Sequence, residues 1–345
     1  MFDEKAYKEI FSQITVSEGT YQEIMEMADR RKERKTVNGR RLAVLTAAVL
    51  LLMAMTLTVF AAEDIANWFR NYFTQNSGVP LSPEQADYIE ESVQDVCMSR
   101  THNGYTLTVE SALTDGFSAF LKLTLRGPEG VTLNADDYGY TYKGKPIFYP
   151  ADGSDPTRSG TWRMSEWRNL EDADTEDNEV SILYTAQGSG FDAGSKWILE
   201  LEDLTAGYLQ EDGFYRDTVI AEGVFRYELV LTDSEGEEMQ LLPQPMEYTA
   251  RVYVSESEYE EVEVTLTSFI LRPLSADLLF KSNVDAASLA GFGQLCVVME
   301  DGSSVKMDLV MGGNGYVRYF PDVPIAVREA DYLLLPDGMR IEVPD

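Results

Sequence analysis

Few side chains in this sequence could carry out nucleophilic or metal-dependent chemistry. The chain holds one histidine, His102, and two cysteines, Cys97 and Cys296. The usual zinc sites need three or four cysteine and histidine ligands, and a Ser-His-Asp arrangement would have to use His102 alone. His102 stands in a turn-forming run from Thr101 to Gly104, which is typical of a surface position. We therefore expect no catalytic residues, no metal or cofactor site and no enzymatic activity.

Two further motifs match ligand sites only in part. Carboxylates alternate from Asp172 to Asn178 as in a calcium loop, but the glycine and the bidentate glutamate of such a loop are missing. The glycine-rich run from Gly312 to Gly315 does not connect a strand to a helix, as a phosphate-binding loop would. We interpret both as solvated loops. Whether Cys97 and Cys296 form a disulfide depends on a distance that the sequence leaves open.

The charge balance argues against nucleic acid as a partner. The chain has 59 acidic and 28 basic residues, a formal charge of −31. Residues 1–62 are nearly balanced, with 9 bases and 8 acids, so the excess negative charge lies beyond them. Phosphate binding requires clustered lysine and arginine side chains, which this larger part lacks.

The most informative element is an uncharged run of 21 residues from Leu42 to Ala62. A helix of this length covers the roughly 30 Å hydrocarbon core of a bilayer. Basic residues precede it, ending in Arg40 and Arg41, and acidic residues follow it, so the positive-inside rule predicts a cytoplasmic N-terminus and an extracytoplasmic C-terminus. A cleaved signal peptide is the alternative, but the run is long and about forty residues precede it. We expect an uncleaved single-pass anchor.

The cytoplasmic tail, residues 1–41, shows helical periodicity. Tyr7, Ile10, Phe11 and Ile14 fall on one face of a helix, and a second short helix is predicted to follow. Helices this short bury too little surface to be stable alone, so they need a partner or a membrane surface. The four side chains are therefore candidate docking residues for a cytoplasmic protein. Attachment to anionic headgroups near the span remains the alternative.

A membrane-proximal helical segment is predicted over residues 63–98. Aromatic side chains that include Trp68 and Phe69 recur at helical spacing just after the span, as in an interfacial aromatic belt, so we expect them to flank the membrane together with Arg40 and Arg41. Ser82, with a proline next and Gln85 three positions later, predicts the start of a second helix that runs to about Val96.

From Tyr105 onward the hydrophobic period changes from helical to two. Short alternating runs are separated by turn signals such as Thr114-Asp115-Gly116, with no helices between them. This pattern predicts a mainly β region made of two antiparallel, Ig-like β-sandwich domains, at residues 99–255 and 256–345. The polar stretch from Asp152 to Asn178 is expected to be a long insertion in the first. The runs that start at Tyr105 and Val262 also share a strand, turn and strand layout, although many hairpins would match as well.

The order of these parts resembles a known family. The tail motif from Phe11 to Met27, the basic run and span, the Leu81-Ser-Pro-Glu-Gln-Ala86 motif and the run from Gly104 to Gly116 are similar to an uncharacterised single-pass membrane family of low-GC Gram-positive bacteria. Its N-terminal module is shared with membrane-bound anti-sigma factors, which carry a different outer domain. The resemblance covers residues 1–130 and implies a regulator whose outer region senses or binds a ligand while its tail restrains a sigma factor.

Two functional hypotheses follow. In the first, the chain is a cell-membrane regulatory protein with a cytoplasmic sigma factor as candidate partner and an unidentified extracytoplasmic ligand. In the second, it is a membrane-anchored envelope-binding or structural protein without a signalling role. A strongly acidic outer region suits solubility in the wall space and is repelled by anionic wall polymer.

Overall fold

The computed structural model describes most of the chain beyond the predicted span. The described residues are 65–143, 147–153, 164–170, 178–188, 191, 194–210, 213–231, 238–253, 259–282, 293–313 and 315–343. The predicted cytoplasmic tail and the run from residue 42 to 62 lie outside them. Among the described residues, no helix is both long and apolar enough to cross a bilayer.

The described chain starts with two helical elements. Residues 65–77 are helical, and α4 (Pro83–Ser92) follows after a short turn. The side chain of Ser82 accepts a hydrogen bond from the backbone of Gln85, and the Gln85 side chain accepts one from the backbone of Ser82. This reciprocal capping box confirms the predicted helix start. The helix ends at Ser92, earlier than predicted, and a strand starts at Gln94.

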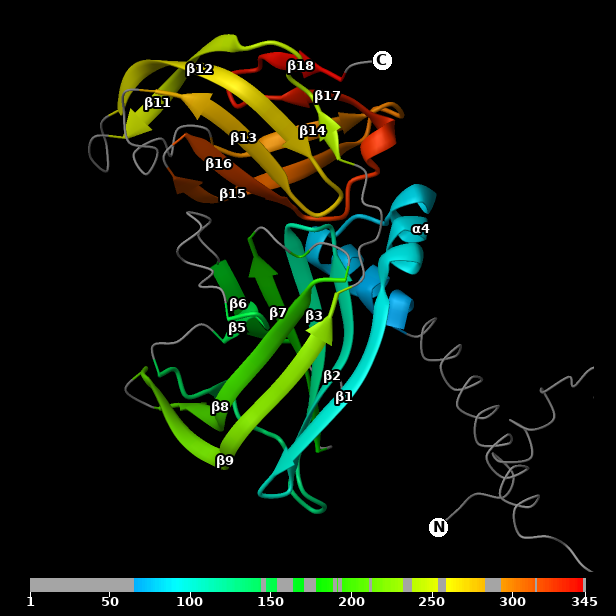
Figure 1. The fold of residues 1–345 in the computed structure, drawn as a ribbon, viewed down its shortest axis with the longest axis vertical. Helices are drawn as coiled ribbons and strands as arrows, with labels where there is room; N and C mark the ends of the chain where they lie inside the picture. Colours follow the sequence, from blue (N-terminus) through cyan, green and yellow to red (C-terminus); the bar gives the residue numbers. More distant parts are fainter. Residues whose placement is uncertain are drawn as a thin grey trace, which may run out of the picture. The chain divides into compact units, whose positions relative to one another are not determined.

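The first half of the β region contains two sheets around one core (Figure 1). Five antiparallel strands lie in the order β1 (Gln94–His102), β2 (Tyr105–Thr114), β3 (Ser118–Arg126), β7 (Glu179–Gln187) and β6 (Met164–Asn169). In the smaller sheet, β8 (Lys196–Leu209) pairs with β4 (Asp137–Tyr140), β5 (Phe148–Pro150) and β9 (Tyr215–Val230). Alternate apolar residues of both sheets form the shared core, while Phe120 of β3 and Leu183 of β7 point to the other face, toward the helices.

The second half forms one continuous sheet of nine strands. Its bounds are β10 (Met239–Gln240), β11 (Met246–Tyr253), β12 (Tyr259–Leu271), β13 (Ala276–Lys281), β14 (Leu295–Met299), β15 (Ser304–Gly313), β16 (Tyr316–Pro321), β17 (Ala330–Leu334) and β18 (Arg340–Glu342). A 3₁₀ turn, η3 (Val327–Glu329), precedes β17. Since β10 and β11 pair with β12, the predicted domain boundary at residue 255 falls inside this sheet.

The two halves share one strand topology. The order β1-β2-β3-β7-β6 of the first half corresponds to β11-β12-β13-β16-β15 of the second. In the same way β8, which pairs with β4 and β5 on one side and with β9 on the other, corresponds to β17, which lies between β14 and β18. The second half differs because β14 also pairs with β15 and so joins what are two separate sheets in the first half. The described chain is therefore mainly β, as predicted, and contains the same arrangement twice.

The strongest match is between the β2–β3 and β12–β13 hairpins. Thr114 pairs with Ala119 beside the first turn, and Leu271 pairs with Ala276 beside the second, 157 residues further along. The same offset relates every pair in β12–β13 to a pair in β2–β3, including the register shift that follows Val109 and Leu266. A bulge bends and twists a strand at one point. The faint similarity between the two runs in the sequence therefore corresponds to a repeated hairpin with a repeated bulge.

Candidate functional site

All four predicted docking residues, Tyr7, Ile10, Phe11 and Ile14, lie outside the described residues. The same is true of Arg40 and Arg41, which are predicted to flank the membrane. The other two predicted membrane-flanking residues, Trp68 and Phe69, lie in the helical segment 65–77.

Phe69 packs in the protein core and not at a membrane surface. Its side chain is 0% exposed, and Phe73, one turn later, is 3% exposed and lies with its ring 5.6 Å from that of Phe120 in β3. A side chain without exposed surface has no contact area left for lipid, so the interfacial prediction is wrong for Phe69. Trp68 is half-buried on the side of the same helix. Helical periodicity identifies an apolar face, but it does not say whether protein or lipid covers it.

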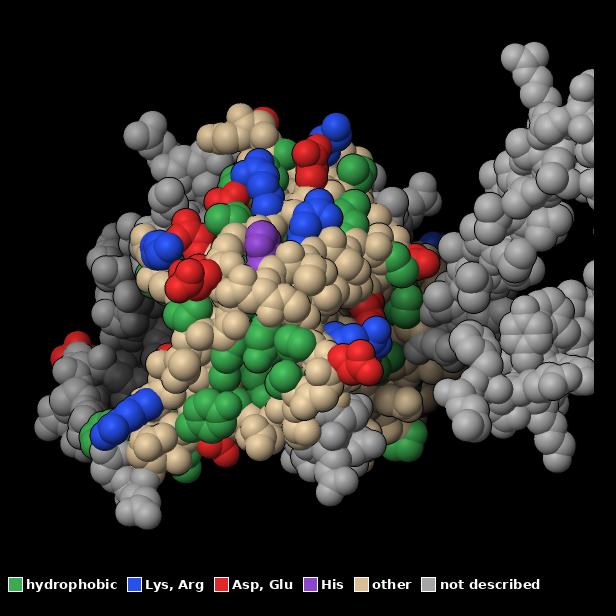
Figure 2. Space-filling model, turned by 90° about the horizontal axis from the view of Figure 1, so that it is seen from below, with side chains coloured by type: hydrophobic (Ala, Val, Ile, Leu, Met, Phe, Trp, Pro, Cys, Tyr) green, Lys and Arg blue, Asp and Glu red, His purple; other side chains and the backbone are tan. Residues whose placement is uncertain are grey.

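His102 contacts strand β9 of the neighbouring sheet. It ends β1, its ring lies edge-on against Phe225 of β9 at 4.7 Å, and its Nε2 is 3.0 Å from the backbone oxygen of Val224. It is the purple side chain at the surface in Figure 2. These contacts link the edges of the two sheets, and neither of them involves an acidic or nucleophilic side chain.

The two cysteines are not paired with each other. Cys97 is exposed and Cys296 is half-buried, and both are free thiols. Cys97 lies in the β1 bulge with φ 48°, and its Sγ donates to Asp95 Oδ1 over 2.9 Å. This hydrogen bond, with some burial, raises the pKa of the Cys97 thiol to about 11. A thiol with so high a pKa is a poor nucleophile at neutral pH.

No group of three or more His, Cys, Asp or Glu side chains in the described part of the chain is arranged to hold a metal ion. Of the acidic run that starts at Asp172, only Asn178 is described. Gly312 and Gly313 end β15, and Gly315 turns the chain into β16 with φ 86°.

A buried polar cluster lies where the two repeated hairpins meet, and no motif in the sequence indicates it. Oδ1 of Asp115 accepts from the backbone of Phe117 and Ser118 in its own turn, over 3.0 and 2.7 Å. Oδ2 accepts from the backbone of Leu274 at 3.0 Å and from the hydroxyl of Ser275 at 2.8 Å in the other turn. Burial raises the pKa of Asp115 despite these donors. The carboxyl therefore links the two halves of the β region through hydrogen bonds.

Arginine and phenylalanine side chains complete this junction. The guanidinium of Arg272 lies 3.7 Å from the ring centre of Phe117, and that of Arg318 lies 5.0 Å from it. Both arginines also pair with Asp277, at 3.0 and 2.6 Å. All three charged residues are buried. Such a satisfied network holds elements in place, and it leaves no group that faces a ligand.

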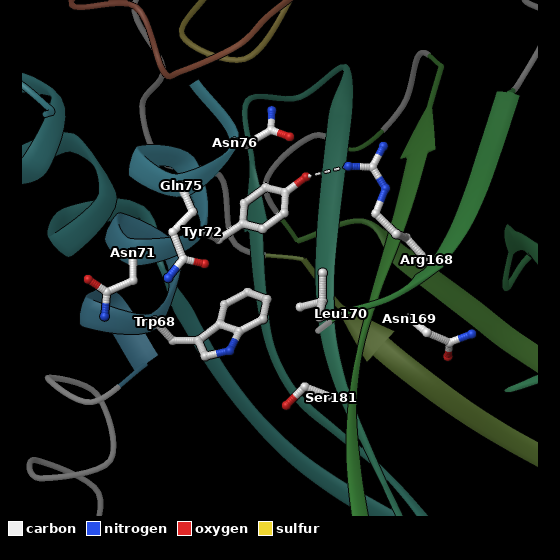
Figure 3. Close-up of a pocket in the computed structure, with 9 residues that line it drawn as sticks. All are labelled: Trp68, Asn71, Tyr72, Gln75, Asn76, Arg168, Asn169, Leu170 and Ser181. Atoms are coloured by element: carbon white, nitrogen blue, oxygen red, sulfur yellow. Dashed lines mark hydrogen bonds between the residues drawn. The ribbon is translucent and has the colours of Figure 1, made fainter. Parts of the chain in front are cut away.

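Among the described residues, a groove on the outer side of the first sheet is a candidate ligand site. It encloses about 590 Å³ between the helical segment 65–77 and strands β6 and β7 (Figure 3). This volume lies in the range of small-molecule sites. The helix contributes Trp68, Asn71, Tyr72, Gln75 and Asn76, and the strand side contributes Arg168, Asn169, Leu170 and Ser181.

The helix wall presents two aromatic rings. Trp68 and Tyr72 lie one turn apart with their planes at 7° and their centres 5.9 Å apart. Figure 3 shows the rings side by side and facing the same way. Lys122 of β3 lies over the Trp68 ring at 5.2 Å and forms an ion pair with Glu110. The rings are thus held on the sheet through a lysine whose charge is already matched.

One charged side chain lines the strand wall. Arg168 Nη1 donates to the Tyr72 hydroxyl over 3.5 Å, and Nη2 donates to Glu166 over 2.8 Å. Burial raises the pKa of Tyr72, so the phenol stays neutral and can donate or accept. The bond to Glu166 raises the pKa of Arg168 and offsets its charge.

Asn169 has an unused acceptor. Its Nδ2 donates to a carboxylate oxygen of Asp137 and to the backbone oxygen of Tyr138, whereas its Oδ1 is buried without a hydrogen-bond partner among the described residues. A buried acceptor of this kind is rare in a folded protein unless water or a ligand satisfies it. The groove therefore has aromatic surface and uncharged polar groups, with no acid, base and nucleophile in contact, and it is suited to binding.

Known proteins match this chain weakly or not at all. No protein-family model and no curated protein matches the chain. The crystal structure of a conserved domain protein from Bacillus anthracis aligns with a TM-score of 0.44 and 12% identity over 70% of this chain and 76% of that one. S. aureus TarS aligns with a TM-score of 0.18 and 9% identity over 81% of this chain and 54% of the TarS chain. Both scores are too low to transfer a fold or an activity.

Proposed function

We propose that this chain is a single-pass regulatory protein of the cell membrane. In this proposal residues 42–62 span the bilayer, the N-terminus is cytoplasmic, and the β region outside contains two Ig-like β-sandwich domains. The outer region binds a ligand, and the tail docks a cytoplasmic transcription factor of the sigma type. The enzyme class is not proposed, because the described site has polar and aromatic groups without a catalytic set.

The observation that carries the proposal is the position of the groove in the chain. Five of its lining residues come from the helical segment 65–77, the first described element after the predicted span. A ligand in the groove contacts both this helix and strand β6. Its binding energy therefore favours one arrangement of the helix on the sheet, and only such differential binding can shift a conformational equilibrium. In this proposal the span transmits the change in helix position to the tail.

The tail is the part that separates a regulator from a plain anchor. Asp in place of both Phe11 and Ile14 removes two anchors of the predicted apolar face and adds two charges. Loss of a buried anchor typically costs more than about 2 kcal/mol, or roughly thirtyfold in affinity. We expect a cytoplasmic protein to co-purify with the wild-type chain from membranes and to be absent with the Phe11→Asp, Ile14→Asp variant.

The matched control carries the same two charges on the opposite face of the same predicted helix, as Ser12→Asp and Gln13→Asp. It should retain the partner, because these positions point away from the apolar face. Both variants should insert in membranes as the wild type does, since the span is unchanged. If no cytoplasmic protein accompanies any of the three forms, the chain is a membrane-anchored binding protein without a signalling role.

A further inference from the structure

The aromatic pair in the groove has a geometry that fits a flat ligand with C–H groups on its face. The rings of Trp68 and Tyr72 are within 7° of parallel, with their centres 5.9 Å apart, and lie side by side in Figure 3, so the two ring faces point the same way along the helix. The face of an aromatic ring carries partial negative charge and attracts the weakly positive hydrogens of C–H groups. A pyranose ring presents such hydrogens on one face and hydroxyls around its edge.

The rim of the groove supplies partners for hydroxyl groups. Asn71, Gln75 and Asn76 are exposed on the helix, and Ser181 lies on the strand side. A carboxamide offers both an acceptor oxygen and a donor NH₂, so it can bond two neighbouring hydroxyls at once. Asn169 also lines the groove, but its Oδ1 is buried and is not counted among these partners. Three exposed amides and a hydroxyl around an aromatic surface suit a ligand whose polar groups both donate and accept.

The charges in and around the groove disfavour an anionic ligand. Arg168 is the one charged residue among the nine described residues that line it, and it is paired with Glu166. Lys122, over the Trp68 ring, is paired with Glu110. The chain as a whole has a formal charge of −31, which repels a polyanion at long range. No unpaired cation in the described groove lining is available to hold a phosphate or a carboxylate.

A peptide is a weaker match for the same groups. Recognition of an extended peptide by strand addition uses a row of backbone donors and acceptors. Here the polar groups gather as side-chain amides on one helical face, at positions 71, 75 and 76. We infer that the groove binds a neutral oligosaccharide, with one sugar ring on the Trp68 and Tyr72 surface and its hydroxyls on the surrounding amides. This inference rests on the proposed role of the groove as the outer ligand site.

The test uses the full chain in a detergent without sugar headgroups. Three neutral trisaccharides, cellotriose, chitotriose and maltotriose, are titrated against it, together with trialanine and a glycerol phosphate polymer. Binding is followed by saturation-transfer NMR and calorimetry. We expect at least one neutral trisaccharide to bind at millimolar concentration or below, with saturation transfer strongest at the ring C–H protons.

Three groove variants locate the site. Trp68→Ala should abolish binding, and Asn71→Ala and Gln75→Ala should each weaken it by roughly tenfold, the loss expected for one hydrogen bond. Tyr142→Ala is the matched control because it removes an aromatic side chain that is 70% exposed and lies outside the groove. It should bind as the wild type does. Thermal unfolding checks that Trp68→Ala is folded, and the two exposed amide variants test the inference independently if it is not.

Several outcomes would overturn the inference. These are the absence of binding by all three trisaccharides, binding of trialanine or of the phosphate polymer alone, and saccharide binding that the groove variants leave unchanged. None of these outcomes decides the proposed function, because membrane topology and tail docking are measured without a ligand. Conversely, saccharide binding without a cytoplasmic partner would support the groove and reject the regulator.

Discussion

Arg272 stands in the β12–β13 turn at the position that Asp115 occupies in the β2–β3 turn, and the two turns contact each other. In each, the backbone N–H of this residue donates to the carbonyl of a serine three positions later, Ser118 or Ser275. The acidic member accepts hydrogen bonds across the junction, while the basic member packs on Phe117 of the opposite turn. Two copies of one hairpin thus form a contact in which opposite charges occupy equivalent positions.

Asp115→Asn should destabilise the protein although the shapes of the two side chains match. Oδ2 accepts from Leu274 and Ser275 while Oδ1 accepts from its own turn, so an amide must place its NH₂ against at least one N–H donor. Leaving a buried donor unsatisfied costs about 1–3 kcal/mol. Chemical unfolding of the two proteins measures the difference. Asp301→Asn is the control: that carboxylate accepts from Ser303 within an exposed turn, so its replacement should leave the midpoint nearly unchanged.

Removal of residues 65–77 should destabilise the β region. From sequence alone, a chain that starts at Leu81 is expected to be soluble and strand-rich, but the structure places Phe69 and Phe73 in the core. Each buried phenylalanine contributes about 3–5 kcal/mol. We expect a chain of residues 63–345 to unfold cooperatively and one of residues 81–345 to melt at a lower temperature or to aggregate. Equal melting temperatures would contradict the packing of this helix on the sheet.

Alkylation of Cys97 should depend on the neighbouring carboxylate. With a pKa of about 11, roughly one thiol in a thousand is ionised at pH 8, so iodoacetamide should react slowly although the side chain is exposed. Asp95→Asn keeps an acceptor oxygen but replaces the carboxylate by a neutral amide, which removes the negative charge that favours the protonated thiol. The pKa should then fall toward its usual value, and the rate at pH 8 should rise by up to about a hundredfold.

Mass spectrometry in a Cys296→Ser background gives these rates over a range of pH. The rate for the Asp95-containing protein should continue to increase up to about pH 11, whereas that of Asp95→Asn should level off earlier. Coincident pH profiles would show that the Asp95 contact does not control the thiol.

Membrane topology is tested by fractionation. An uncleaved anchor at residues 42–62 keeps the full-length chain in membranes during carbonate extraction, and protease added from outside spares a tail of about sixty residues. Recovery of a soluble mature protein that begins near Ala62 would instead identify a cleaved signal peptide.

The sequence was sufficient where local chemistry decides the structure. The start of α4 follows from the capping box of Ser82 and Gln85, and the β2–β3 turn follows from Asp115 and Gly116, whose φ is 83°. Alternation from Tyr105 onward identified strands whose inner faces are buried, and the mainly β prediction is confirmed. These signals act within a few residues, so one sequence contains them completely.

The candidate groove could not be found in this way. Its two walls come from residues 68–76 and from residues 168–181, and the second wall includes β6, which lies in a stretch that the composition identified only as a polar insertion. No spacing in the sequence relates Tyr72 to Arg168, because packing of the helix against the sheet brings them together. The same holds for the aromatic stripe at Phe69, whose covering surface is a distant strand.

The repeated hairpin also bears on how the chain reaches its fold. Two segments with the same length, register and bulge can compete for the same neighbours during folding, and misassembly of this kind is characteristic of proteins with repeated units. The residues that differ must direct each copy to its own sheet. Phe120 in β3 corresponds to Asp277 in β13, and Lys122 corresponds to Leu279, so only the first copy offers an apolar ring and a lysine to the aromatic helix. Docking of that helix therefore distinguishes the two copies and favours correct pairing over exchange.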